Sequence, residues 1–139
     1  MLPLEKQVCS LEIAKRLKEL NCPQESLFWW RYRQGNLDDK SLDFPPVLEY
    51  DPPEYSPSSI WTQCSAFTVA ELGELLPFSV MIRGRVTGWD CYKREDGQGW
   101  EIWLQENTRL VGNKIEATTE ADARALLLIH LIKNNLCTT

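Results

Sequence analysis

The positions of hydrophobic and polar residues follow two periods along the chain, one helical and one extended. In residues 10–21, apolar side chains recur every three or four positions with Lys, Arg and Glu between them, which predicts an amphipathic helix with Ser10 as its N-cap. In residues 26–33 the two kinds of residue alternate instead, which predicts a β-strand. The face expected to be buried carries Phe28, Trp30 and Tyr32, and the outward face carries Leu27, Trp29, Arg31 and Arg33.

Two further helices are marked by their capping residues. A Thr68–Glu71 capping box opens a short helix that ends at Pro77. Thr119 and Asp122 cap a longer helix that runs to about residue 136. The apolar stripe of this closing helix is wider than one face of a surface helix requires. The helix is therefore predicted to lie either inside the core or against a second copy of the chain.

The segment between these two helices has the pattern of an antiparallel meander. Apolar and polar residues alternate over 78–87. A hairpin loop at 94–99 leads to a return strand at 100–105. A short third strand is predicted at 110–111 or at 114–117, with a turn between the two. The face of 78–87 that is expected to be buried carries Phe78, Val80, Ile82 and Val86.

Prolines concentrate in residues 36–59, which hold five of the eight. This stretch is too stiff for a helix and has too few backbone donors for a central strand. It is therefore predicted to be a long surface loop that is extended around residues 47–50. An interdomain linker is the alternative, although the segment that precedes it is short for a separate fold.

Together these elements predict a single α+β domain over residues 1–139. Its expected architecture is an antiparallel sheet, in the form of a meander, with the helices packed on one face. A length of 139 residues and a hydrophobic fraction of 43% allow such a domain a real core without metals or disulfides.

Charge and cysteine content narrow the classes of function. The chain has 15 basic and 20 acidic residues, a net charge of −5, whereas proteins that bind nucleic acid usually present clustered Lys and Arg. We therefore do not expect a nucleic-acid partner. Five scattered cysteines without a CxxC pair indicate free thiols in a reducing compartment. Because no apolar run is long enough to span a bilayer, we expect a cytoplasmic protein without a membrane partner.

The sequence contains no recognisable catalytic motif. His130 is the single histidine and lies inside the closing helix, where a structural role is expected. No P-loop or dinucleotide-binding glycine motif occurs, and one histidine with dispersed cysteines argues against a metal site. Hairpin carboxylates such as Asp90 and Glu101 would support catalysis only if they converged on a metal ion. We expect a protein that is not an enzyme and has no metal or cofactor.

Two groups of cationic and aromatic side chains are candidates for binding, one on the outward face of the 26–33 strand and one on the meander. Arginine binds phosphate through paired hydrogen bonds and aromatic rings stack on bases, so one interpretation is that the two groups together form a pocket for a nucleotide or a single strand. The alternative is that the arginines keep an open sheet face soluble and stack on the tryptophans. The candidates are Trp29, Arg31, Arg33, Arg83, Arg85, Trp89 and Tyr92, with Lys93 and Arg94 next to Tyr92.

The proline-rich stretch offers a third candidate. Residues 48–55 combine acidic side chains with two tyrosines on a stiff backbone, as a peptide-like docking segment does. The alternative is a surface loop that its tyrosines hold in place.

Two segments are the most distinctive as strings of residues. They are 65–77 (SAFTVAELGELLP) and 117–125 (ATTEADARA), with a tryptophan-rich hairpin between them. In this order they resemble a family of small, uncharacterised phage and prophage proteins, over roughly residues 5–136. The shared motifs are helix caps and apolar stripes, so no catalytic residue is transferred. The resemblance implies a mobile-element setting and an accessory role in the cytoplasm of a bacterial host.

These observations lead to competing hypotheses of function. The first is a non-enzymatic accessory protein of phage or prophage type that binds and modulates a host factor, and that forms a homo-oligomer through the closing helix. The second is a small-ligand protein that binds or sequesters a nucleotide. A purely structural or interaction protein is a further alternative. An enzyme ranks last, because it needs the hairpin carboxylates to meet a metal ion.

Overall fold

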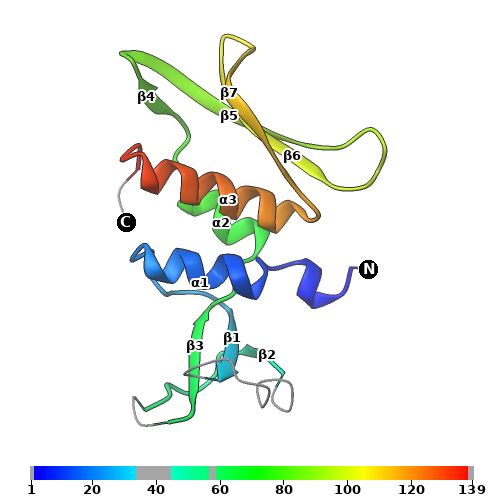
Figure 1. The fold of residues 1–139 in the computed structure, drawn as a ribbon, viewed down its shortest axis with the longest axis vertical. Coiled ribbons are helices and arrows are strands. Elements are labelled where there is room, and N and C mark those ends of the chain that lie inside the picture. The colour runs from blue at the N-terminus through cyan, green and yellow to red at the C-terminus, as the bar shows by residue number, and fades with distance from the viewer. Residues whose placement is uncertain (1, 34–44, 57–58, 138–139) are drawn as a thin grey trace.

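The computed structural model describes residues 2–33, 45–56 and 59–137 (Figure 1). Part of the loop predicted at 36–59 lies outside these residues. The elements are η1 (Leu4–Lys6), α1 (Leu11–Glu19), β1 (Phe28–Arg33), β2 (Val47–Tyr50), β3 (Trp61–Ser65), α2 (Val69–Leu75), β4 (Val80–Ile82), β5 (Arg85–Lys93), β6 (Trp100–Glu106), β7 (Arg109–Ala117) and α3 (Glu120–Lys133).

The strands form two antiparallel sheets. One has the order β2–β1–β3 and the other the order β4–β5–β6–β7. The predicted α+β class is therefore confirmed, and the second sheet is the predicted meander. The additional sheet arises because the extended part of the proline-rich stretch pairs with β1 on one side and β3 pairs with β1 on the other.

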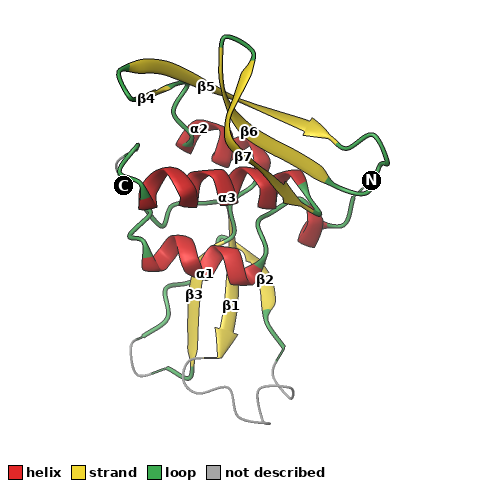
Figure 2. Cartoon of the chain, turned by 45° about the horizontal axis from the view of Figure 1, so that its top comes forward, coloured by secondary structure: helices red, strands yellow, loops and turns green. Residues whose placement is uncertain are grey.

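The helices lie between the two sheets and do not cover one face of a single sheet (Figures 1 and 2). α2 and α3 pack against each other, and α3 also contacts β5, β6 and β7. α1 contacts α3 on one side and β3 on the other. The resulting order of layers is four-stranded sheet, α2 with α3, α1, and three-stranded sheet.

The closing helix α3 is enclosed by its own chain. Its side chains from Ala121 to Leu131 are largely buried, Leu127 and Leu131 almost completely. Of the two arrangements that its wide apolar stripe predicts, burial inside the core is the one observed in the monomer.

Capping explains where the helices begin. The Thr68–Glu71 capping box is present, with the Thr68 hydroxyl accepting from the Glu71 N–H at 3.2 Å and the Glu71 carboxylate accepting from the Thr68 N–H at 2.9 Å. Ser10 is the N-cap of α1, as predicted, but its side chain makes no capping bond. Its backbone N–H instead donates to the Asp122 carboxylate at 2.7 Å, which ties the start of α1 to the first turn of α3.

The two faces predicted for β1 are the observed ones. Trp30 is buried, and Phe28 and Tyr32 pack against the same core. The indole N–H of Trp30 donates to the carbonyl of Cys9 at 2.9 Å, so its polar atom is satisfied inside the core. The outward face, which carries Trp29 and Arg31, is therefore turned away from the helices.

The meander differs from its prediction at a turn and at a bulge. Arg83 and Gly84, both with positive φ, form a two-residue turn, and Val86 pairs with Met81 beyond it. The alternation predicted across 78–87 is broken there, and Val86 is 65% exposed. Phe78 precedes β4 and is 96% exposed, so its predicted place on the buried face is wrong. The third strand, predicted at 110–111 or at 114–117, covers both positions as β7, which keeps its pairing to β6 through a shift of register opposite Ile102–Leu104.

Candidate functional site

The chain that follows β2 crosses the outward face of the three-stranded sheet. Asp51 turns the chain with a positive φ of 44°, and its N–H donates to the carbonyl of Leu27 at 3.0 Å. Four residues later, the Tyr55 hydroxyl donates to the Glu49 carboxylate on β2 at 2.9 Å. We call residues 51–56 the strap, since it is held at both of these points.

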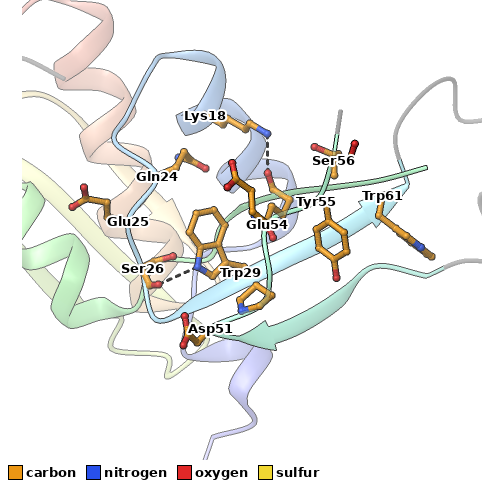
Figure 3. A pocket seen from close by; sticks show the side chains of 13 residues that line it. Lys18, Gln24, Glu25, Ser26, Trp29, Asp51, Glu54, Tyr55, Ser56 and Trp61 are labelled. Atoms are coloured by element: carbon orange, nitrogen blue, oxygen red, sulfur yellow. Dashed lines mark hydrogen bonds between the residues drawn. The ribbon is translucent and has the colours of Figure 1, made fainter. Parts of the chain in front are cut away.

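A cavity of about 800 Å³ lies between the strap, the outward face of the sheet and the end of α1 (Figure 3). We call it the strap cleft. Its walls come from three separate parts of the sequence: Lys18 with 24–29, the strap, and 61–63. The predicted docking segment 48–55 therefore supplies one wall, and the predicted binding residue Trp29 supplies another.

Three aromatic side chains line the strap cleft: Trp29, Tyr55 and Trp61. The indole N–H of Trp29 donates to the carbonyl of Ser26 at 3.1 Å, which fixes the ring in the middle of the lining (Figure 3). The Trp61 ring has the guanidinium carbon of Arg31 at 4.5 Å from its centroid. Each of the three rings is thus held in place by a contact with another residue of the chain.

The charges in the strap cleft are mostly negative. The carboxylates of Glu25, Asp51 and Glu54 line it, and none of them forms an ion pair with another residue in the described ranges. The amine of Lys18 opposes them, but it donates to the carbonyl of Gln63 at 2.7 Å (Figure 3). The three carboxylates outnumber the one amine, and that amine is already hydrogen-bonded. The charge of the strap cleft therefore favours a positively charged occupant.

Tyr55 takes part as a hydrogen-bond donor. Partial desolvation and the hydrogen bond to the Glu49 carboxylate raise the pKa of the Tyr55 hydroxyl. The hydroxyl therefore stays protonated at neutral pH and holds the strap against β2.

The arginines predicted on β1 are engaged within the sheet. The Nε atom of Arg31 lies 3.2 Å from the Glu49 carboxylate, and its guanidinium stacks on Trp61. Arg33 is half-buried at the end of β1, where it pairs with Trp61 across the strands. For Arg31, the observed arrangement is the predicted alternative, in which the cation stacks on a tryptophan of the open sheet face.

The second predicted group is dispersed over the four-stranded sheet. Arg85 pairs with Glu106 at 2.8 Å, and Arg83 is exposed in the β4–β5 turn. The indole of Trp89 donates to the carbonyl of Pro77 at 3.0 Å, on the face turned toward the helices. Tyr92 points outward and stacks on Trp103, with 5.1 Å between ring centroids.

The two predicted groups do not meet, because the helices separate the sheets that carry them (Figure 1). Of the two interpretations offered for these groups, a single nucleotide pocket that joins both is therefore not the one observed. Sequence reasoning also missed Lys18, Glu25 and Trp61 as lining residues. Trp61 could have been noticed, since it comes directly after the proline-rich stretch. The residues around it, however, do not indicate that it lies near Trp29.

Over residues 2–33, 45–56 and 59–137, no group of three or more His, Cys, Asp or Glu side chains is placed to hold a metal ion. His130 is exposed on α3 and lies 3.4 Å from the Asn134 amide nitrogen. Within the same ranges, every helix is too short or too polar to cross a membrane.

Comparison with known proteins gives no relative for this fold and cleft: no family model matches the chain, and no curated protein or solved structure matches it either.

Proposed function

We propose that the protein is a binding protein whose strap cleft receives an arginine or lysine side chain from a basic segment of a partner protein. The observation that carries this proposal is a set of three carboxylates, Glu25, Asp51 and Glu54, that form no ion pair with the other described residues and surround a cavity with aromatic walls. This proposal is a specific version of the first hypothesis from the sequence, a non-enzymatic factor that binds and modulates a host protein.

A cation gains two kinds of interaction in such a cleft. The carboxylates attract it, and the faces of Trp29, Tyr55 and Trp61 offer cation–π contacts, which contribute about 0.5–1 kcal/mol each at exposed sites. The protein already uses this chemistry on the same sheet face, since the Arg31 guanidinium lies over Trp61. An arginine of the partner would repeat that arrangement inside the cleft.

The same charges disfavour the nucleotide alternative at this site. A phosphate group in the strap cleft would face the carboxylates of Glu25, Asp51 and Glu54, and the nearby Lys18 amine is already bound to the Gln63 carbonyl. Two of the four candidate arginines are paired with acidic residues, Arg31 with Glu49 and Arg85 with Glu106.

The biological setting and the oligomeric state stay predictions. The phage or prophage assignment, with a bacterial host protein as partner, rests on the resemblance of 65–77 and 117–125 alone. A homo-oligomer through α3 would have to use its half-buried apolar residues, Leu126 and Ile132, because most of the others are covered by the chain itself.

The test is a calorimetric titration of the purified protein with a hexa-arginine peptide at low and at physiological salt. We expect binding that weakens with salt, and weaker binding of hexa-lysine, because guanidinium stacks better on aromatic rings. Glu54→Gln and Asp51→Asn should each weaken binding by roughly two- to fivefold, as for other exposed ion pairs.

Glu95→Gln is the matched control, since it removes the same charge from the exposed β5–β6 loop on the other sheet. It should leave the affinity nearly unchanged. Equal weakening by Glu95→Gln and Glu54→Gln would show that the peptide responds only to the net charge of −5, and would refute the cleft as the site.

A further inference from the structure

A second cavity, of about 750 Å³, lies at the end of the molecule where α3 begins. The N-terminal segment around η1 forms one side of it and the β5–β6 loop forms another, and both lie at this end of α3 (Figures 1 and 2). The starts of β1 and α2 close it from the inside. We call it the hairpin cavity. It shares no lining residue with the strap cleft.

The inner walls of the hairpin cavity are apolar. Leu4, Phe28, Val69 and Trp100 line it, and each of them is only half-buried although it packs against the main core. Ligand sites commonly combine such hydrophobic and aromatic walls with a few polar groups, and they measure about 300–1,000 Å³. The hairpin cavity is of this size and composition, so an apolar ligand body would bury side chains that the chain leaves partly open.

Two of the three charged residues that line the hairpin cavity are lysines. Lys6 and Lys93 line the cavity, and neither forms an ion pair with a residue in the described part of the chain. The lining contains one carboxylate, that of Glu120, which accepts from the Arg124 guanidinium at 2.9 Å. An anion in this cavity would therefore meet two lysines without an ion pair and no unpaired carboxylate.

We propose that the hairpin cavity binds a small amphipathic anion, with its apolar body between Phe28, Val69 and Trp100 and its single anionic head at Lys6 and Lys93. This function is separate from the recognition of a basic segment by the strap cleft, because the two sites have opposite charge and different residues. It gives the protein a small-molecule site whose ligand is selected by charge as well as by apolar surface.

The test uses decanoate as the probe, with decan-1-ol as the neutral analogue and decyltrimethylammonium as the cationic one. The protein has six tryptophans, so its indole N–H signals can be followed individually by NMR after assignment with Trp→Phe variants. We expect decanoate to shift the indole signal of Trp100 and to leave that of Trp61, in the strap cleft, in place. Decan-1-ol and decyltrimethylammonium should bind at least about tenfold more weakly.

Two substitutions at exposed positions test the head-group site without disturbing the core. Lys6→Gln and Lys93→Gln should each weaken decanoate binding by roughly threefold and together by about tenfold. Lys133→Gln, an exposed lysine at the end of α3 that lines neither cavity, is the control and should have no effect.

Three results would overturn the proposal. The first is no shift of the Trp100 signal at any decanoate concentration below aggregation. The second is equal affinity for decan-1-ol, which would remove the role of the amines. The third is the same loss of affinity in Lys133→Gln as in Lys93→Gln. A failure of hexa-arginine to bind the strap cleft would not affect any of these readouts, since Trp100 lines the hairpin cavity and does not line the strap cleft.

Discussion

Cys9 connects parts of the protein that are far apart in the sequence. Its N–H donates to the carbonyl of Phe67 at 2.9 Å, and its carbonyl accepts from the indole of Trp30 at 2.9 Å. Its thiol is fully buried, and burial raises the pKa of that thiol to about 12. The backbone groups hold the segment in place, while the thiol occupies the core as a small apolar group.

The raised pKa of Cys9 predicts a loss of stability at alkaline pH. In the unfolded chain the thiol ionises near its ordinary pKa of 9.0, whereas in the folded protein it stays protonated up to about pH 12. Its contribution is therefore fully present below pH 9 and is lost as the pH rises toward 12. Denaturant unfolding measured over this range should show a falling free energy of unfolding. Cys9→Ala should make that fall shallower, and an unchanged slope would contradict the assignment to this thiol.

At the scale of elements, the β6–β7 turn contains one residue, Thr108, that suits its conformation poorly. Asn107 and Thr108 both have positive φ, 48° and 69°, as a two-residue hairpin turn requires. Asparagine tolerates this conformation, but a β-branched residue such as threonine does so only under strain.

Thr108→Gly should therefore stabilise the protein, by roughly 0.5–1 kcal/mol, because glycine adopts positive φ without a steric penalty. The measurement is the midpoint of urea unfolding at constant slope. Gly112→Ala, at a positive φ of 77° in the bulged part of β7, is the reverse experiment and should destabilise. A Thr108→Gly variant that is less stable than the wild type would show that the threonine makes an interaction that outweighs its strain.

Elements whose signals are local could be predicted, and contacts between distant segments could not. The capping box at Thr68 and the two faces of β1 depend only on residues that are close in the sequence, and both predictions are confirmed. The pairing of β1 with β3 depends on residues about thirty positions apart, and β3 itself lacks a clear alternation. The strap cleft joins three such segments. Trp29 and the 48–55 stretch were therefore identified singly, whereas the cavity between them was not.

At the scale of the whole molecule, the two sheets share one core. A single cluster of buried side chains runs from Trp30 on one sheet, through Leu17 and Leu127 on the helices, to Ile102 on the other sheet. The predicted single domain would unfold with this cluster as one unit. We expect one cooperative unfolding transition, with tryptophan fluorescence and far-ultraviolet circular dichroism giving the same midpoint. Two separate transitions would mean that the sheets belong to independently folding units.

The central position of α3 has a consequence for synthesis on the ribosome. β6 and β7 are complete before residue 120 is made, yet the face that carries Ile102 and Leu104 is covered by α3. Until that helix has emerged, the nascent chain exposes this sheet face and cannot complete the contact between α1 and α3. Of the described elements, α3 is synthesised last, and both the four-stranded sheet and α1 need it to complete their packing. We therefore expect a nascent chain that is stalled before α3 to bind chaperones.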